Sequence, residues 1–249
     1  MEDGVAQGGE EVTTSHSPSP ISSGVAAIVP AAGSGSRMGG APKQLRLLGG
    51  VPVLVQTLRA FARHPHVGAL VVVVPPYDVP VFRRMMTDYD LSATVTAGGR
   101  TRQDSEGRGL DAVPAGTEIV LVHDAVRPFV ADGTSAAVIE ATRADGAAAL
   151  AVPVADTLRR AAGDAFGETV AREGLWRMQT PQAARLDWLH EAHAAAARDG
   201  FAGTDEVALL MRAGRRVRLV EGDARNLKLT HPEDWALAEV LWERWVKGD

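Results

Sequence analysis

The chain of 249 residues has no cysteine, no long hydrophobic run and no excess of positive charge. Without cysteine it can form no disulfide framework, iron–sulfur cluster or thiolate zinc site. A transmembrane helix needs a run of about 18 apolar residues, so we expect none here. The formal net charge of −5 is too small to indicate a nucleic-acid binder or a membrane-surface protein. What is present, 45% hydrophobic and 23% charged residues, is typical of a globular protein with a sizeable core.

Residues 1–24 differ in composition from the rest of the chain. They contain Glu2, Asp3, Glu10 and Glu11 but no lysine or arginine, and they are rich in Gly, Ser, Thr and Pro. Such a segment cannot bury enough apolar area to offset its ordering entropy, so we expect a disordered tail. It has neither the basic start and apolar middle of a secretory signal nor the arginines of a transit peptide. We therefore expect a cytoplasmic protein whose folded domain begins after the tail.

Beyond the tail, short apolar runs alternate with amphipathic stretches. Strands are predicted at Val25–Val29, Leu70–Val74, Ala93–Thr96, Ile119–Val122, Ala147–Val154 and Val217–Val220. Helices are predicted at Val51–Arg63, Asp104–Ala112, Gly133–Arg143, Leu186–Arg198, Thr204–Ala213 and Pro232–Val246. This alternation predicts an α/β fold, a Rossmann-like, doubly wound, mostly parallel sheet over residues 25–246. Ligands bind such sheets beyond the carboxyl ends of the strands, so a site is expected in the loops that follow them.

Residues 153–176 interrupt the alternation. Two strand-like pieces, around Asp156–Arg159 and Thr169–Arg172, flank a small polar centre with Gly163 and Gly167. This pattern predicts a β-hairpin arm inserted into the domain. Because a lone two-stranded hairpin is marginal in water, the arm should lie on another surface. A second copy of the chain is the favoured surface, and the arm's own domain is the alternative.

The loop after the first strand runs from Gly33 to Lys43 and combines four glycines with two cations, Arg37 and Lys43. Glycine lets a backbone approach a phosphate closely and direct its N–H groups toward it. The loop lacks the Gly-Lys-Ser/Thr end of a Walker A motif, and Met38 occupies the sixth position of the dinucleotide fingerprint. It is therefore neither of these motifs, and a phosphate-binding loop is favoured over a solvated turn.

Later loops after predicted strands also carry polar groups. Gly98–Ser105 could approach a flat base, although a helix cap alone would explain Ser105. Asp124 follows the fourth strand and could hold Mg²⁺, its water shell or a ribose hydroxyl, whereas a structural pair with Arg127 is the alternative. Lys228 follows the last strand and is one of only three lysines in the chain.

Taken together, these motifs resemble those of one enzyme family. V-P-A-A-G-x-G-x-R-M followed by P-K-Q resembles the signature loop of nucleotidyltransferases that activate sugars and polyols. The later motifs GG-x-x-R-x-D-S, V-H-D-A-x-R-P, D-T-L-R, L-W-x-x-Q-T-P-Q, T-D-E and E-G-x-x-x-N-x-K-x-T narrow the resemblance. From about Val25 to Val246 the chain resembles the 2-C-methyl-D-erythritol 4-phosphate cytidylyltransferases of the non-mevalonate isoprenoid pathway.

The resemblance implies an activity and partners. The family transfers CMP from CTP to 2-C-methyl-D-erythritol 4-phosphate, giving 4-diphosphocytidyl-2-C-methyl-D-erythritol and pyrophosphate, and requires Mg²⁺. Its members are homodimers whose β-arms cross to the neighbouring active site. Two alternatives remain from the sequence, a ribitol 5-phosphate cytidylyltransferase and a non-catalytic nucleotide-binding protein. We expect CTP and a polyol phosphate as ligands, and neither nucleic acid nor a membrane as a partner.

The resemblance also implies roles for individual residues. Catalytic roles fall on Arg37, Lys43, Arg172 and Lys228. The nucleotide-binding positions are Ala31, Ala32, Gly33, Gly35, Gly99, Ser105 and Asp124. The positions for the phosphorylated polyol are Arg127, Thr157, Thr180, Thr204 and Thr230. Asp124 is the one candidate metal ligand, directly or through water, and Arg100 replaces an Asp of some members, which leaves base recognition there to the backbone of Gly99.

The implied chemistry agrees with the residue types present. The nucleophile is a phosphate oxygen that is already anionic at neutral pH, so no general base is needed. The reaction does require relief of repulsion between anions, in-line alignment, and stabilisation of charge on the α-phosphate and the leaving pyrophosphate. Arginine, lysine, backbone N–H groups and Mg²⁺ supply these effects.

Overall fold

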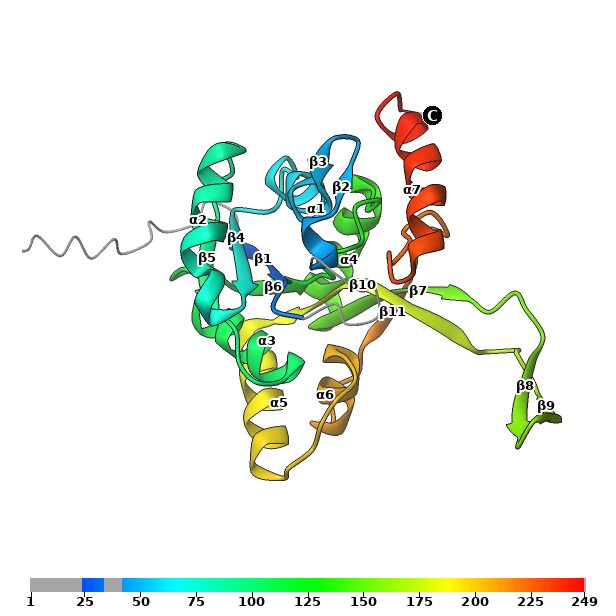
Figure 1. The fold of residues 1–249 in the computed structure, drawn as a ribbon. Helices are drawn as coiled ribbons and strands as arrows, with labels where there is room; N and C mark the ends of the chain where they lie inside the picture. Colours follow the sequence, from blue (N-terminus) through cyan, green and yellow to red (C-terminus); the bar gives the residue numbers. More distant parts are fainter. Residues whose placement is uncertain (1–23, 34–41, 249) are drawn as a thin grey trace, which may run out of the picture.

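A seven-stranded sheet forms the centre of the molecule, which the computed structural model describes for residues 24–33 and 42–248 (Figure 1). In the order β11-β7-β10-β6-β1-β4-β5, β10 is antiparallel to both neighbours and the other pairs are parallel. The strands are β1 (Val25–Pro30), β4 (Ala69–Val74), β5 (Thr94–Ala97), β6 (Ile119–Val122), β7 (Ala147–Pro153), β10 (Trp176–Arg185) and β11 (Arg218–Glu221). The predicted α/β fold with a mostly parallel sheet is confirmed, and the predicted tail lies outside the described residues apart from Gly24.

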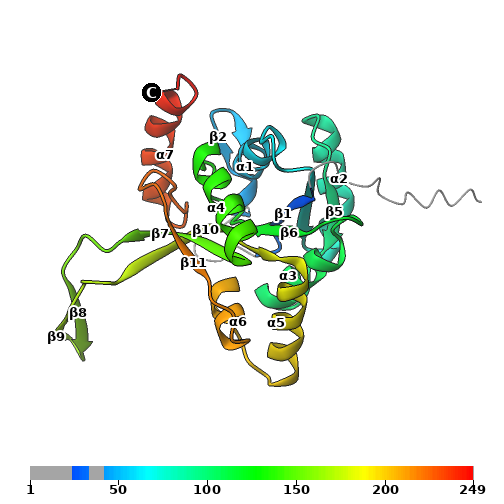
Figure 2. The ribbon, with the colours of Figure 1, turned by 180° about the vertical axis from the view of Figure 1, so that it is seen from behind.

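Helices cover both faces of the sheet (Figures 1 and 2). One face is covered by α1 (Val53–Ala62), α2 (Val79–Asp88) and α4 (Asp132–Asp145). The other is covered by α3 (Arg102–Asp111), α5 (Leu186–Arg198) and α6 (Glu206–Arg212). The last helix, α7 (Pro232–Trp245), packs on a third apolar cluster beside the small hairpin of β2 (Leu47–Leu48) and β3 (Val51–Pro52). No helix of the described residues is long and apolar enough to cross a membrane.

Alternation of side chains along β4 explains why this strand is uniformly apolar. Leu70, Val72 and Val74 pack into the core under α1 and α2. Val71 and Val73 point the other way, into the core under α3 and α5. Successive side chains of a strand face opposite sides of a sheet, so a strand covered on both sides needs apolar residues at every position.

The sequence pattern does not reveal helix α2 or strand β10. Helix α2 has only a short apolar stripe, with Phe82 and Met86 as its buried residues. Strand β10 has the pattern of a loop that ends the arm, because Pro181 removes a ladder donor and argues against a central strand. The strand accommodates this proline at a register shift between Met178 and Gln182. The predicted helix Val51–Arg63 is also too long, since its first two residues form β3.

The predicted arm projects from one side of the sheet (Figure 1, right). β7 and β10 lead into it, and its outer part is the antiparallel pair β8 (Leu158–Ala162) and β9 (Ala165–Val170). Phe166, near the end of the hairpin, is 87% exposed. The hairpin is therefore present but does not fold back over its own domain in this structure, and its contact with a second copy of the chain stays a prediction.

The direction of the strands determines where the site lies. β1, β5, β6 and β11 run parallel to one another, because β10 is antiparallel to both β6 and β7. The loops that follow these four strands therefore leave the sheet at one edge. Residues from distant parts of the sequence meet there.

Candidate active site

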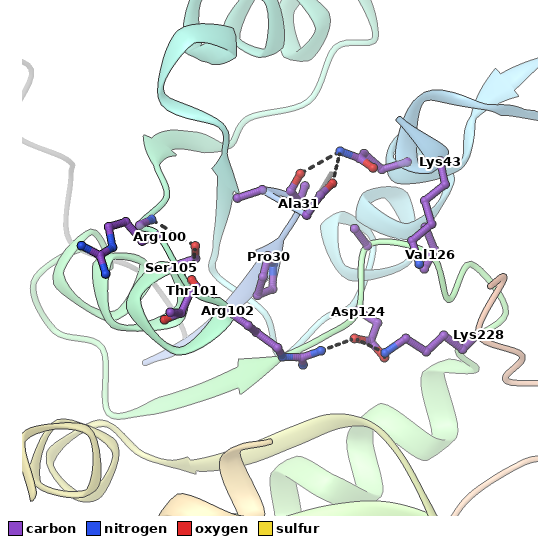
Figure 3. A pocket seen from close by; sticks show the side chains of 15 residues that line it. Pro30, Ala31, Lys43, Arg100, Thr101, Arg102, Ser105, Asp124, Val126 and Lys228 are labelled. Carbon is purple, nitrogen blue, oxygen red and sulfur yellow. Dashed lines mark hydrogen bonds and ion pairs between the residues drawn. The ribbon is translucent and has the colours of Figure 1, made fainter. Parts of the chain in front are cut away.

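A cavity of about 490 Å³ opens at this edge of the sheet (Figure 3). Its lining includes most of the residues predicted for nucleotide binding and catalysis: Ala31, Ala32, Gly33, Lys43, Gly99, Ser105, Asp124 and Lys228. They come from the loops after β1, β5, β6 and β11, from the first turn of α3 and from the short 3-10 helix η2 (Lys43–Leu45). The structure thus places these separate sequence motifs in one site.

The first residues after β1, Ala31 to Gly33, are held in place by a buried amide. Gln44 Nε2 donates to the carbonyl oxygen of Ala31 at 2.8 Å and lies 3.4 Å from that of Gly33. The amide of Ala31 in turn donates to the carbonyl of Val73 in β4. These bonds keep the backbone of Ala31 to Gly33 at the wall of the cavity, and Lys43 lies next to Gln44 on η2 at the same wall.

The loop after β5 forms the opposite, mainly polar wall. Thr101 and Asp104 form a capping box at the start of α3, so Ser105 is not the helix cap. Instead, Ser105 Oγ accepts a hydrogen bond from the Gly99 amide at 3.0 Å and donates to the Thr101 carbonyl at 2.8 Å. A Cβ on Gly99 would lie 2.3 Å from Cβ of Asp104, so this position has room only for glycine. The exposed Arg100 lines the same cavity.

Asp124 is the centre of the charged part of the site. Its carboxylate accepts hydrogen bonds from Arg127 Nε at 2.9 Å and from Arg102 Nη1 at 3.1 Å, and Lys228 Nζ lies 3.0 Å from Oδ2 (Figure 3). Burial would raise the pKa of Asp124, but Lys228, Arg102 and Arg127 outweigh it and hold the pKa well below its ordinary value. One buried carboxylate therefore fixes the cations of three separate segments, and it is ionised at all ordinary pH values.

A hydrogen-bonded chain under Asp124 explains its orientation and excludes a general base there. The Asp124 amide donates to Thr180 Oγ1 at 3.1 Å, and Thr180 Oγ1 lies 3.1 Å from His123 Nδ1. His123 Nε2 faces the carbonyl of Arg127 at 3.0 Å, which requires the proton on Nε2. Burial lowers the pKa of His123 to about 4, so this fully buried imidazole is neutral and has both nitrogens engaged.

Lys228 is presented by a tightly bonded loop. Two residues earlier, the buried Asn226 donates from Nδ2 to the carbonyl of Thr180 at 2.8 Å. The carbonyl of Asn226 accepts from Arg127 Nη1 at 2.7 Å. Thr230 does not line either cavity of the site, and its hydroxyl donates to the Lys228 carbonyl at 3.1 Å. This bond ties Thr230 to the backbone of Lys228. The predicted contact of Thr230 with the polyol phosphate stays a prediction.

A second cavity of about 150 Å³ adjoins the first. It contains three of the residues predicted for the phosphorylated polyol, Arg127, Thr180 and Thr204. The two cavities share Arg102, Asp124 and Lys228. Ligands in the two cavities would therefore meet across one set of charged side chains.

The remaining predicted residues lie elsewhere. Thr157 and Arg172 are exposed on the arm and line neither cavity of their own chain. Arg172 Nη1 donates to the carbonyl of Ala155 within the arm. Gly35 and Arg37 lie outside the described residues, so their predicted roles stay predictions.

Arg102 is the residue that sequence reasoning missed. It lines both cavities and contacts Asp124, yet the sequence motif GG-x-x-R assigns it no role. A signal was available, because Arg102 is the first residue of α3 and a cation at a helix N-terminus opposes the helix dipole. An arginine at this unfavourable position indicates a role other than stabilising the helix.

The described residues of the site form no preformed metal centre. Within residues 24–33 and 42–248, no group of three or more His, Cys, Asp or Glu side chains could hold a metal ion. Of the residues described as lining the larger cavity, Asp124 is the one acid, and both of its oxygens accept from cations. Mg²⁺ is usually held by one or two carboxylates together with phosphate oxygens and water. The residues therefore fit an ion that arrives with a triphosphate.

Fold and site together define a class of protein. At the carboxyl ends of the strands, a Rossmann-like sheet has a cavity lined by backbone groups and by clustered cations. The histidine next to Asp124, His123, is neutral and has both ring nitrogens in hydrogen bonds, so it cannot act as a general base. This arrangement is that of a nucleotidyltransferase, in which charge stabilisation rather than proton transfer carries the chemistry.

Comparison with known proteins specifies the family. The model of the 2-C-methyl-D-erythritol 4-phosphate cytidylyltransferases matches residues 25–244. The protein of that name from Salinibacter ruber is 51% identical over 223 residues, which cover 89% of this chain and 94% of the relative. The one from Deinococcus radiodurans is 47% identical over 217 residues, covering 87% and 88%. The crystal structure of the cytidylyltransferase from Thermus thermophilus superposes with a TM-score of 0.76 at 39% identity, covering 89% and 98%. The chain belongs to the 2-C-methyl-D-erythritol 4-phosphate cytidylyltransferase family.

Proposed function

We propose that the chain transfers CMP from CTP to 2-C-methyl-D-erythritol 4-phosphate and releases pyrophosphate. The observation that carries this proposal is the pair of adjoining cavities that share Arg102, Asp124 and Lys228. Two phosphorylated ligands repel each other, and a shared set of cations is what brings them together at low cost. Membership of the family supplies the identity of the two ligands.

CTP occupies the larger cavity in this proposal. Its cytosine lies against the wall formed by Gly99 and Ser105, and its triphosphate lies along the loop after β1, near Lys43. The base then meets backbone groups that a glycine leaves accessible, since a Cβ at Gly99 has no room. The smaller cavity takes the polyol phosphate against Arg127, Thr180 and Thr204.

The bond changes need charge stabilisation and no base. A phosphate oxygen of the polyol attacks the α-phosphorus of CTP, and the bond to the bridging oxygen of the pyrophosphate breaks. Lys228 and Arg102 line both cavities, so they neutralise the attacking and the attacked phosphate together. Asp124 keeps both cations oriented before the ligands arrive, which removes a reorganisation cost from the reaction.

Mg²⁺ is the cofactor in this proposal, and Asp124 is the side chain that would hold it. When bound with the triphosphate, the ion would supply further positive charge for the developing negative charge of the pyrophosphate. The cations on Asp124 would have to share that carboxylate with the ion. Loss of turnover when EDTA is added, restored by excess Mg²⁺, tests this part of the proposal.

The arm serves the neighbouring subunit of a homodimer in this proposal. Thr157 and Arg172 lie on the exposed arm, away from both cavities of their own chain, although both match positions for the polyol phosphate. Arm exchange would bring each Arg172 to the partner's smaller cavity. The exposed Phe166 near the end of the arm would then be covered by the second copy.

Pyrophosphate release measured with purified protein, Mg²⁺ and CTP tests the activity. Release is expected with 2-C-methyl-D-erythritol 4-phosphate and not with ribitol 5-phosphate, and it should fall when UTP or GTP replaces CTP. Faster release with ribitol 5-phosphate would identify the protein as a ribitol 5-phosphate cytidylyltransferase, the alternative named above. Binding of CTP with no release for either polyol phosphate would indicate a nucleotide-binding protein without catalysis.

A further inference from the structure

Behind Arg102 lies a buried cluster of ionisable side chains that the reaction described above does not use. It is formed by Glu106 of α3, His193 of α5 and Glu206 at the start of α6. Only 3% of the Glu106 side chain and 2% of the Glu206 side chain are exposed. Buried carboxylates are rare unless they are paired, so two of them beside an active site call for an explanation.

Arg102 connects this cluster to the cavities. Its Nε donates to Glu106 Oε1 at 2.7 Å, and its Nη1 donates to Asp124 Oδ1 at 3.1 Å. Arg102 and Glu106 are four residues apart, which places them on one face of α3. The guanidinium therefore bridges two buried carboxylates, while 40% of the Arg102 side chain is exposed toward the site (Figure 3).

Glu206 and His193 lie on the far side of Glu106. His193 Nε2 is 2.9 Å from Glu206 Oε2, and the other oxygen, Oε1, is buried without a hydrogen-bond partner. Burial would lower the pKa of His193, but Glu206, Glu106 and Asp111 outweigh it and raise the pKa. An unsatisfied buried carboxylate oxygen is costly, and a proton in the cluster reduces that cost.

If all its groups were ionised, the cluster would hold more negative than positive charge. The groups that act on Glu106 are Arg102 on its own helix, His193 on α5 and Glu206 on α6, with Asp124 on the other side of Arg102. Burial, and after it the charge of Glu206, raises the pKa of Glu106 to about 8, despite the opposing effects of Arg102 and His193. A polyphosphate beside Arg102 would add further negative charge and favour the protonated carboxyl group still more.

We propose that Glu106 is a positioning residue that holds Arg102 at the junction of the two cavities and takes up a proton when CTP binds. The inference rests on the proposed function only for the identity of the ligand. Linkage is reciprocal: if bound CTP increases the proton affinity of Glu106, protonation increases the affinity for CTP by the same factor. Affinity for CTP should therefore fall as the pH rises through the titration of Glu106.

Proton uptake can be measured without turnover. CTP is titrated calorimetrically at pH 8, at constant Mg²⁺, in HEPES and in Tris, whose ionisation enthalpies differ and neither of which is a phosphate. For the wild type the binding heats should differ between the two buffers, and for Glu106→Gln they should coincide. Glu140→Gln is the matched control, because it removes an exposed glutamate that pairs with Arg143 on α4, and it should behave like the wild type.

A second variant keeps the test independent of one substitution. Glu206→Gln removes the neighbouring negative charge, so Glu106 loses its proton more readily and the uptake should move to lower pH. In steady-state assays, KM for CTP should rise about threefold to tenfold from pH 7 to pH 9 in the wild type and stay flat in Glu106→Gln, with kcat following the same pH profile in both.

The outcomes separate this proposal from the proposed function. Binding heats for the wild type that are equal in both buffers would overturn the role of Glu106 and leave the proposed function intact. Absence of any binding heat with CTP would overturn the proposed function, and the proton linkage with it. Heats that differ between buffers in the wild type, and no longer differ in Glu106→Gln, would establish the linkage even if pyrophosphate release failed.

Discussion

Asp124 sets the arrangement of charges at the scale of single residues. It is a poor stabiliser taken alone, because burying a carboxylate has a large desolvation cost. Its value lies in fixing Arg102, Arg127 and Lys228 at distances of 2.9 to 3.1 Å, so that their charges are already aligned when an anion arrives. Arg127 is itself buried, whereas Arg102 and Lys228 are partly exposed and can turn toward a ligand.

Lys228→Ala should separate the function of this lysine from folding. We expect turnover to fall by a factor on the order of 100 or more, because the variant loses a cation that lines both cavities. The melting temperature should change little, since 37% of the Lys228 side chain is exposed and its removal leaves no core cavity. Lys247→Ala, at an exposed lysine after α7, is the control and should keep full turnover. Equal turnover in the two variants would remove Lys228 from the reaction.

Glu106 makes the stability of the protein depend on pH. The folded protein binds the proton of Glu106 up to a pKa of about 8, whereas the unfolded chain releases it near the ordinary value of 4.5. The folded state thus binds more protons between these values, so the stability of the wild type falls as the pH rises. Glu106→Gln should be the more stable protein by a margin that grows with pH, by up to about 1.4 kcal/mol per pH unit. Thermal melts from pH 5 to pH 8 check this, and a constant margin would contradict it.

At the scale of secondary-structure elements, the hairpin of β2 and β3 depends on α7. Trp235 Nε1 donates to the carbonyl of Leu47, and Leu48 shares an apolar cluster with Trp235. The loop after β11 enters the same cluster through Leu229, only one residue from Lys228. Packing of α7 therefore supports both the hairpin that follows η2 and the loop that presents the lysine.

Two adjacent glycines in the turn between β2 and β3 can test how closely α7 packs against this turn. Gly49 and Gly50 both have positive φ, at 58° and 77°. A Cβ on Gly49 would lie 2.1 Å from Nε1 of Trp242, whereas one on Gly50 would meet nothing within 4 Å. Gly50→Ala should lose about 1 kcal/mol of stability from backbone strain alone, and Gly49→Ala about 2 to 4 kcal/mol because overpacking adds to it. Equal losses in denaturant unfolding would show that Trp242 moves aside without cost.

At the scale of the whole molecule, the two cavities of one chain lack two of the residues predicted for the site. The cavities gather polar groups from β1, β5, β6, β10 and β11, but the arm carries Thr157 and Arg172 away from them. A closed C2 dimer with crossing arms would restore both residues to a site, because in such an interface each subunit gives what it receives.

Mixed dimers test whether the arms cross. Arg172→Ala and Lys228→Ala subunits should each be nearly inactive as pure proteins. If arms cross, a refolded equal mixture should regain about a quarter of the wild-type turnover, since half of the dimers are mixed and each of these has one intact site. The control is a mixture made without refolding, in which the subunits have not exchanged. Lack of recovery despite confirmed mixed dimers would contradict arm exchange.

Local pattern was sufficient for much of this protein. The uniformly apolar β4 and the glycines and cations placed after predicted strands are read directly from the chain, since β alternation and loop composition act over a few residues. They predicted the parallel sheet and the arm, and together with the resemblance to the family they indicated eight of the residues that line the larger cavity. Strand β10 was not readable, because Pro181 gives a loop signal that only the register shift against β7 overrides.

Other features were decided by tertiary packing alone. Nothing in the sequence brings Glu106 close to Glu206, 100 residues later, because this proximity exists only when α5 packs against both α3 and α6. The same holds for the junction of the cavities. Arg102 reaches Asp124 from the start of α3 and Lys228 from the loop after β11, and only the direction of the strands brings these segments to one edge. The sequence by itself determined which chemical groups follow the strands. The tertiary structure decided which of these groups interact electrostatically. Such interactions depend on distance and burial, and neither is determined by the local sequence.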